Sequence, residues 1–153
     1  HTFVPTEKES GVVNPHFGIT SLVSDFNQDG YLDMIWTNID TPSIAYINQG
    51  GTNNYVQVDL GDDAEGQGAK VTVETSTKKL TDWLVSGEGL ASDQTALLNF
   101  GLGKETSINK ITVNYPNGTV FELEKPGINS IIDIKKERAL QQVVTDSIAP
   151  IEE

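Results

Sequence analysis

Oxygen-bearing side chains recur at alternate positions in one short acidic loop of the sequence. The segment Asp25–Asp33 carries Asp25, Asn27 and Asp29 at positions 1, 3 and 5, and Asp33 at position 9. A loop that winds around a cation presents alternate side chains to it, and carboxylate and amide oxygens are ligands that calcium prefers. The sequence therefore predicts a calcium site in this loop.

Gly30 and Tyr31 complete the predicted site. A glycine at position 6 permits the sharp turn that brings the backbone carbonyl of position 7, here Tyr31, to the ion. An EF-hand would place a glutamate at position 12, where this chain has Trp36, and would have helices on both flanks. Both flanks alternate like strands instead. The loop is therefore not an EF-hand, and we expect Asp33 to close the coordination.

The alternative for this loop is a polar turn whose Asp and Asn side chains only cap their own backbone. Carboxylates crowded around one turn repel each other without a cation, which favours the calcium interpretation. The segment 19–38 that contains the loop resembles a single FG-GAP or VCBS repeat, the blade motif of integrin-like β-propellers. In that repeat type the ion usually fixes a loop.

Residues suited to catalysis are few. The chain has no cysteine, and its two histidines, His1 and His16, lie in its least regular region. A Ser-His-Asp triad could use only His16, and the sequence has no Gly-x-Ser-x-Gly turn. We therefore expect no enzyme. One alternative is a copper site of His1 with His16, as in secreted oxidative polysaccharide-cleaving enzymes. The irregular segment that contains His1 and His16 is not expected to hold the geometry of a copper site, so we expect His16 to be a simple turn residue.

Other segments have weaker functional interpretations. The acidic run 61–66 could hold a second calcium, but it lacks ligands that alternate about a turn glycine, so we expect a solvated loop. The glycine pairs in 87–89 and 101–103 open no helix, so we expect strand-end turns rather than phosphate loops. Four aromatic side chains could stack on sugar rings if exposed, but are expected in the core: Trp36, Tyr55, Trp83 and Tyr115.

The charge of the chain constrains its partners. With 22 acidic and 10 basic side chains, the formal net charge is −12 and the isoelectric point is about 4.4. We expect no nucleic-acid partner, because phosphate binding needs clustered Lys and Arg. The sequence contains no apolar run long enough to predict membrane insertion. An acidic surface suits a compartment with millimolar calcium, and the start at His1 suggests a processed piece. We expect a secreted, periplasmic or cell-surface protein.

Two-residue alternation of apolar and polar side chains, broken by Gly or Pro, predicts an all-β fold. We expect strands near 19–25, 32–38, 43–48, 54–60, 69–75, 79–87, 95–101, 108–115, 119–124 and 129–135. The clearest hairpin joins 111–115 to 119–123 through the turn Pro116–Gly118. From residue 136 we expect a short helix or a frayed extension.

A domain boundary is expected near Gln49–Asn53, the stretch richest in turn residues. Residues 1–50 would form a propeller-blade-like hairpin around the calcium loop, too small to bury both its faces. Residues 54–135 would form a self-contained antiparallel β-sandwich, and residues 136–153 a tail. The expected core of the sandwich is Val58, Val71, Val73, Trp83, Leu98, Phe100, Ile111, Val113, Phe121 and Ile132.

Four motifs follow one another in the second part of the chain. They are Gly68–Val73, Trp83–Ser92, Asn99–Gly103 and Ile111–Gly118. Their order behind a calcium repeat resembles the ASPIC/UnbV domain, which follows FG-GAP or VCBS repeats in secreted proteins. The family more often has His at the position of Asn99, and Trp-Pro-Ser-Gly where this chain has Tyr115–Gly118. These departures leave the expected fold unchanged.

The resemblance implies an extracellular, calcium-containing module, usually the C-terminal part of a larger propeller protein, that binds a glycan or a protein at a cell surface. Only the calcium ligands carry over residue by residue. A purely structural cap that seals a propeller is the alternative. An exposed aromatic patch would favour recognition, whereas buried aromatics and a broad apolar face on residues 1–50 would favour the cap. Nothing in the sequence sets an oligomeric state.

Overall fold

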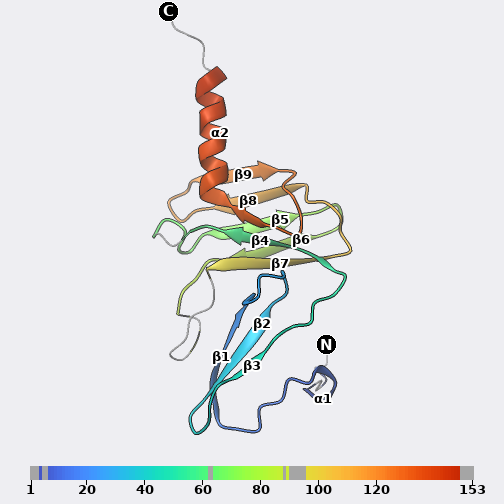
Figure 1. The fold of residues 1–153 in the computed structure, drawn as a ribbon. Coiled ribbons are helices and arrows are strands. Elements are labelled where there is room, and N and C mark those ends of the chain that lie inside the picture. Colours follow the sequence, from blue (N-terminus) through green and yellow to red (C-terminus); the bar gives the residue numbers. More distant parts are fainter. Residues whose placement is uncertain (1–3, 5–6, 62–63, 88, 90–95, 149–153) are drawn as a thin grey trace, which may run out of the picture. The chain divides into compact units, whose positions relative to one another are not determined.

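The structure is a computed structural model that describes residues 4, 7–61, 64–87, 89 and 96–148. Within these ranges the protein is mostly β, with three small sheets and a C-terminal helix (Figure 1). None of the described helices is long and apolar enough to span a bilayer.

The chain divides into two compact units. The first comprises residues 1–50 with 87–94, and the second comprises residues 51–86 with 95–153. One sheet belongs to the first unit and two belong to the second. The predicted partition into 1–50, 54–135 and a tail stays a prediction, because compactness does not show which part folds alone.

The first unit is built on a three-stranded antiparallel sheet. Its strands are adjacent in chain order: β1 (Gly18–Ser24), β2 (Asp33–Asn38) and β3 (Ile44–Tyr46). The loop between Ser24 and Asp33 carries most of the predicted calcium ligands, and Asp33 is the first residue of β2. A four-residue helix, α1 (Glu7–Ser10), precedes the sheet and was not predicted.

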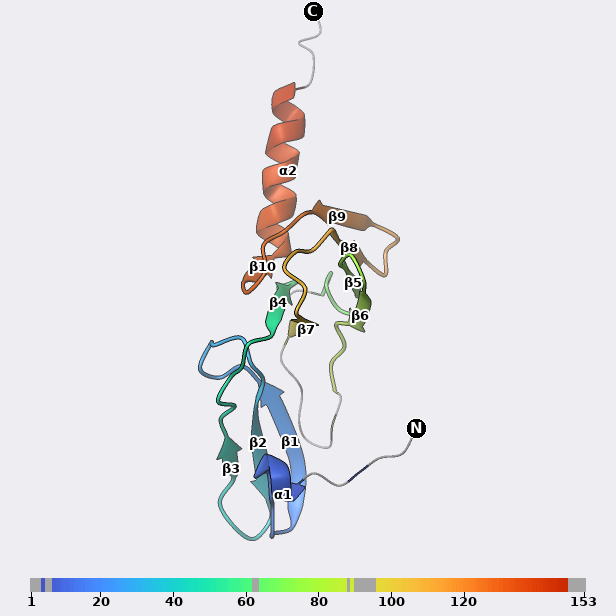
Figure 2. The same cartoon turned by 90° about the vertical axis from the view of Figure 1, so that its right-hand side faces the viewer.

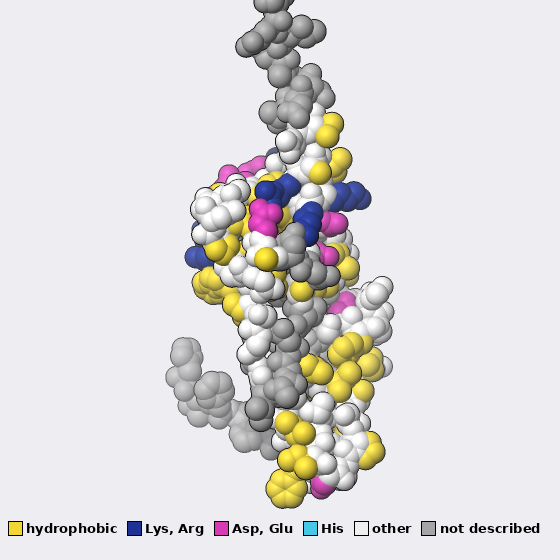
Figure 3. Space-filling view, turned by 90° about the vertical axis from the view of Figure 1, so that its left-hand side faces the viewer, with side chains coloured by type: hydrophobic (Ala, Val, Ile, Leu, Met, Phe, Trp, Pro, Cys, Tyr) yellow, Lys and Arg dark blue, Asp and Glu magenta, His cyan; other side chains and the backbone are white. Residues whose placement is uncertain are grey.

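The side chains of this sheet are only half-buried. Between residues 11 and 50, Asp33 is the one fully buried residue. Large apolar side chains at the sheet ends remain in solvent, Phe17 at 76% exposure and Ile39 at 75%. Yellow apolar side chains are visible over this unit in Figure 3. The first unit therefore has no apolar core of its own among residues 11–50.

Two sheets make up the second unit. One has the strand order β10 (Ile131–Asp133), β4 (Asn54–Asp59), β7 (Leu97–Gly103). The other has the order β6 (Lys79–Trp83), β5 (Lys70–Glu74), β8 (Lys110–Asn114), β9 (Val120–Glu124). Figure 2 shows strands of the two sheets beside each other.

One strand pair in this unit is parallel. β10 runs parallel to β4, with Ile132 opposite Val58, whereas the other pairs are antiparallel. The prediction of purely antiparallel pairing is therefore wrong for β10. The physical reason is the connection: β10 follows β9, a strand of the other sheet, so no hairpin forces it to run against its neighbour.

The core of the second unit draws on both sheets. Alternate residues of β4, β5 and β8 are fully buried: Val56, Val58, Val71, Val73, Ile111 and Val113. The predicted hairpin is confirmed, with Val113 opposite Phe121 across the Gly118 turn. Apart from Trp83 and the partly buried Ile132, all the residues predicted for the core are buried.

Trp83 was assigned to the core, and this prediction is wrong. Its side chain is 49% exposed. The edge strand β6 places Leu80 opposite the buried Val73, so Trp83, three residues later, points to the other face, opposite Lys70. Its exposure therefore follows from the register of β6 on β5.

A 15-residue helix, α2 (Ile134–Ile148), begins directly after β10, two residues earlier than predicted. Ile134 is fully buried and anchors it. Arg138 lies 4.9 Å from the Tyr115 ring centroid and 3.1 Å from the Glu65 carboxylate. Gln141 donates a hydrogen bond to the backbone carbonyl of Glu122 in the edge strand β9. The first half of α2 is thus attached to the second unit, as Figure 1 shows.

We expect a fragment of residues 52–153 to unfold in a single cooperative transition, because its core is built from its own two sheets. Residues 1–50 alone should show no protected amides even with calcium, because three half-buried strands lack a core. Thermal denaturation of the first fragment and hydrogen exchange of the second test this. An unfolded 52–153 fragment would mean that the whole chain shares one folding unit.

Candidate metal centre

Asp25 organises the first half of the acidic loop. Its Oδ1 accepts a hydrogen bond from the backbone N–H of Asp29 at 2.9 Å, and its Oδ2 accepts one from Gly30 at 2.8 Å. Gln28 and Gly30 adopt positive φ angles of 60° and 88°, so the chain reverses sharply between Asp25 and Gly30. The predicted turn glycine is therefore at a position whose backbone favours glycine.

Asn27 and Asp29 continue the network. Asn27 Nδ2 donates to Asp29 Oδ2 at 2.9 Å, and Asp29 Oδ1 accepts from the backbone N–H of Tyr31, also at 2.9 Å. Both side chains are exposed. Tyr31, whose carbonyl is the predicted backbone ligand, follows directly on the Gly30 turn. Asn27 and Asp29 are thus bonded to each other through their side chains, and Asp29 is also bonded to the backbone of Tyr31.

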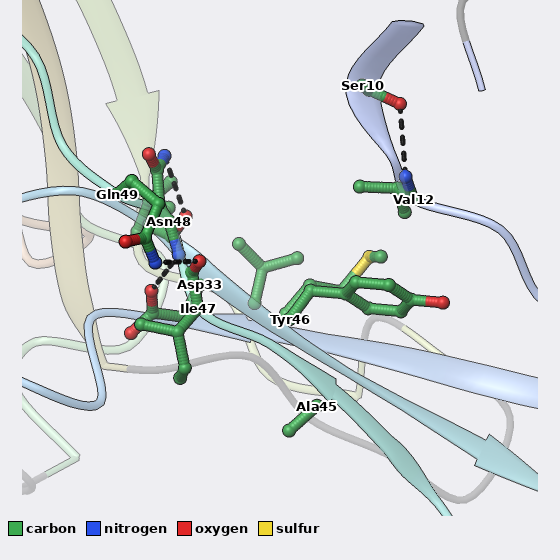
Figure 4. Close-up of a pocket in the computed structure, with 11 residues that line it drawn as sticks. Ser10, Val12, Asp33, Ala45, Tyr46, Ile47, Asn48 and Gln49 are labelled. Atoms are coloured by element: carbon green, nitrogen blue, oxygen red, sulfur yellow. Dashed lines mark hydrogen bonds between the residues drawn. The ribbon is translucent and has the colours of Figure 1, made fainter. Parts of the chain in front are cut away.

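Asp33 closes the loop from inside the protein. It is 1% exposed. Its Oδ2 accepts a hydrogen bond from the backbone N–H of Phe26 at 3.0 Å, and its Oδ1 accepts one from the backbone N–H of Asn48 at 2.7 Å. Figure 4 shows Asp33 beside Asn48 at one end of the sheet. One carboxylate therefore joins the start of the loop to the chain beyond β3.

The first fifty residues of the sequence are poor in basic side chains. Residues 1–50 contain six acidic side chains, Glu7, Glu9, Asp25, Asp29, Asp33 and Asp40, and one basic side chain, Lys8. The ion pairs Lys79–Glu74, Lys110–Glu122 and Arg138–Glu65 all belong to the second unit. Burying a carboxylate without a counter-charge costs free energy. A bound cation would supply that counter-charge.

The predicted ligands fit a hard cation in their chemistry. All of them are oxygen donors, and a carboxylate oxygen that accepts one N–H still has a second lone pair. Within the described ranges, however, no three Asp, Glu, His or Cys side chains form a group that could hold a metal ion as they stand. Asp25, Asp29 and Asp33 instead turn their oxygens to backbone N–H groups. Ion binding would have to compete with these bonds.

An open pocket of about 780 Å³ lies in the first unit. Its wall includes Val23, Met34 and Tyr46 from the three strands, and Val12 from the segment before them (Figure 4). The Tyr46 hydroxyl donates a hydrogen bond to the carbonyl of Val13. Asp33 lies at its end and accepts two backbone N–H bonds.

The other sequence-predicted sites receive different outcomes. His1, Asp62 and Asp63 lie outside the described residues, so the copper site and the second calcium site stay untested. His16 is exposed. Gly101 and Gly103 lie in the last residues of β7, and Gly103 has a positive φ of 68°, as expected where a strand passes into a turn.

The four aromatic residues do not gather in one exposed platform. Tyr115 is 6% exposed and lies under Arg138, whereas Trp83 is on an outer sheet face with the Lys70 ammonium 5.5 Å from its ring centroid. Trp36 and Tyr55 are half-buried. Trp83 is therefore the one of the four whose ring is offered to solvent.

Asn48 is a contact of the loop that sequence reasoning missed. Its bond to Asp33 is made by the backbone N–H, which every residue except proline has. The only signal was the turn-rich composition of Asn48–Gly51. That composition predicts a turn but not what the turn touches.

Comparison with known proteins places the chain in a family. A model of the family described as ASPIC and UnbV matches residues 60–141, more than half of the chain. The protein therefore belongs to the ASPIC and UnbV family. The match begins after the acidic loop Asp25–Asp33, so the resemblance of residues 19–38 to an FG-GAP or VCBS repeat stays a prediction.

The chain is also similar to cartilage acidic protein 1 of two vertebrates. Identity is 30% over 128 residues with the protein of Xenopus tropicalis and 28% over 128 residues with that of Homo sapiens. Each comparison covers 76% of this chain and 19% of the relative. The chain thus spans about a fifth of the length of these relatives.

Replacing one predicted ligand should separate ion binding from turn formation. We expect Asp29→Ala to lower the melting temperature much more in calcium than in chelator, because only the ion-bound native state gains stability by mass action. At a calcium concentration about 100 times the dissociation constant, the wild-type gain is about 2.7 kcal/mol. Asp40→Ala, an exposed carboxylate of the same unit, is the matched control. Equal losses in both buffers would show that the loop is only a turn.

Proposed function

We propose that the protein is a non-catalytic, calcium-stabilised recognition module. The observation that carries the proposal is the Asp33 carboxylate, which is 1% exposed and which, within the described residues, accepts hydrogen bonds from two backbone N–H groups in a segment with one basic residue. A calcium ion would supply the missing positive charge and fix the loop. It would be held by side-chain oxygens of Asp25, Asn27, Asp29 and Asp33 and by the Tyr31 carbonyl.

The proposal includes a finer architecture than three sheets. We propose that the two sheets of the second unit form a β-sandwich and that the first unit is a propeller-blade-like FG-GAP or VCBS repeat. Support for the sandwich comes from the core, which contains buried side chains of both sheets. Support for the blade comes from the antiparallel order β1–β2–β3 and from its half-buried faces.

An extracellular site of action fits this chemistry. Calcium-binding extracellular modules work with dissociation constants of about 10⁻⁴ to 10⁻³ M, and a loop that must exchange backbone bonds for an ion suits that range. We propose a secreted, periplasmic or cell-surface protein that binds a glycan or another protein there. Its net charge of −12 argues against a nucleic-acid partner.

Recognition is favoured by the exposed ring of Trp83. A half-exposed indole on an outer sheet face beside Lys70 can stack on the CH face of a sugar. We expect Trp83→Ala to lose any glycan binding that the wild type shows on a glycan array, with its fold unchanged by circular dichroism. Val120→Ala, an exposed apolar residue of the same sheet, is the control. Binding that survives in Trp83→Ala would exclude this face.

A purely structural cap of a propeller is the second candidate. The exposed Phe17 and Ile39 of the first unit favour it, because such side chains are normally covered by a neighbour. A wild-type chain that binds no glycan and no protein would support the cap.

The calcium site itself is tested by a crystal structure grown with calcium. We expect an ion at about 2.3 to 2.6 Å from the proposed oxygens. Asp25, Asp29 and Asp33 would then share their carboxylates between the ion and the backbone. A calcium-grown crystal in which this loop holds no ion would refute the site.

A further inference from the structure

The outer face of the four-stranded sheet carries its side chains in rows that run across the strands. Strand register places Trp83 of β6, Lys70 of β5 and Asn114 of β8 next to one another, and these three residues are here termed the outer row. All three are exposed. Because neighbouring strands lie about 4.8 Å apart, the outer row spans about 10 Å. A ligand as small as two linked sugar rings can therefore contact all of it.

The three lysines of this face differ in their partners. Lys79 Nζ lies 2.7 Å from the Glu74 carboxylate, and Lys110 Nζ lies 2.7 Å from the Glu122 carboxylate. Within the described ranges Lys70 makes no ion pair, and its ammonium lies 5.5 Å from the centroid of the indole ring beside it. The charge of Lys70 is therefore not neutralised by a carboxylate of this face.

A row of threonines separates Lys70 from the ion pairs. Thr72 of β5 is opposite Thr81 of β6 and Thr112 of β8. Its hydroxyl lies 3.3 Å from that of Thr81. Glu74 follows one row further on, four residues from Lys70 along β5, which corresponds to about 13 Å between Cα atoms. The outer row is thus a place where a cation and an aromatic ring face solvent together.

We infer that the outer row binds an anionic sugar. The indole of Trp83 stacks on the CH face of the sugar ring, and the Lys70 ammonium pairs with its carboxylate or sulfate group. The Asn114 amide, which has both donors and an acceptor, bonds to sugar hydroxyls. This inference rests on the proposed recognition function and uses none of the proposed calcium ligands.

The net charge of −12 limits which anionic glycans fit. Exposed charges further apart than about 8 Å are largely screened at physiological ionic strength, so Lys70 dominates the interaction with a charge placed at the outer row. A long, densely charged polyanion would also run over the acidic remainder of the surface, which repels it. The outer row therefore suits a glycan in which anionic sugars are isolated or terminal.

The first test measures wild-type binding on an array of oligosaccharides that each contain one uronic acid, one sialic acid or one sulfated sugar. Each is paired with its neutral form, which is carboxyl-reduced or desulfated. We expect at least one anionic member to bind about three- to fivefold more tightly than its neutral partner, the size of an exposed ion pair. The preference should disappear in about 1 M salt.

The array separates the inference from the function on which it rests. Equal binding of anionic and neutral members would overturn the inference and leave glycan recognition standing. A wild type that binds no member would overturn both. Which anionic members bind distinguishes a carboxylate from a sulfate ligand.

The second test compares Lys70→Gln with Lys79→Gln on the same array. Both lysines are exposed on the same sheet face, but only Lys79 has a carboxylate partner, so Lys79→Gln is the matched control. We expect Lys70→Gln to bind anionic and neutral members equally, whereas Lys79→Gln and Lys70→Arg keep the preference. Circular dichroism checks that each variant is folded. A Lys70→Gln variant that still prefers the anionic members would overturn the inference.

Discussion

The buried carboxylate of Asp33 is the interaction on which the first unit depends. It joins three segments that share no apolar core: the start of the acidic loop through Phe26, strand β2 through its own backbone, and the segment after β3 through Asn48. Large apolar side chains of this unit stay in solvent, so hydrophobic burial cannot specify how these segments meet. The buried Asp33 carboxylate specifies this arrangement, because few other arrangements of the segments would satisfy its hydrogen bonds. The desolvation of the carboxylate opposes this stabilisation.

The second unit is held by a different force. Its sheets contribute fully buried valines and isoleucines to one cluster, and Ile134 extends that cluster into α2. Its charged contacts, such as Arg138 with Glu65, lie at the surface, where an ion pair contributes little. Removal of the proposed calcium ion is therefore expected to affect the first unit first, since Asp33 is the one buried charge among the described residues.

The alternation of apolar and polar side chains correctly predicted which strand residues are buried and where the acidic turn lies. It identified Ile111 and Val113 as buried neighbours on β8 and placed the acidic residues in one turn between two strands. It failed at Trp83, because an apolar side chain on an edge strand can take either face and only the register decides which. The direction of β10 and the contact of Asn48 with Asp33 could not be predicted from the sequence. The direction depends on a connection between two sheets, and the contact is made by a backbone N–H, and neither depends on residue type.

The hydrogen bonds of the loop bear on how strongly an ion could bind. The carboxylates of Asp25, Asp29 and Asp33 accept hydrogen bonds from backbone N–H groups, which relieves part of their mutual repulsion. The affinity for calcium would then depend on the difference in free energy between the carboxylates' bonds to the ion and their hydrogen bonds to the backbone, and not on the new bonds alone. The proposed calcium site would then bind its ion weakly, which suits an ion present at about millimolar concentration. The bonds that Phe26 and Asn48 donate to Asp33 are among those with which an ion would have to compete.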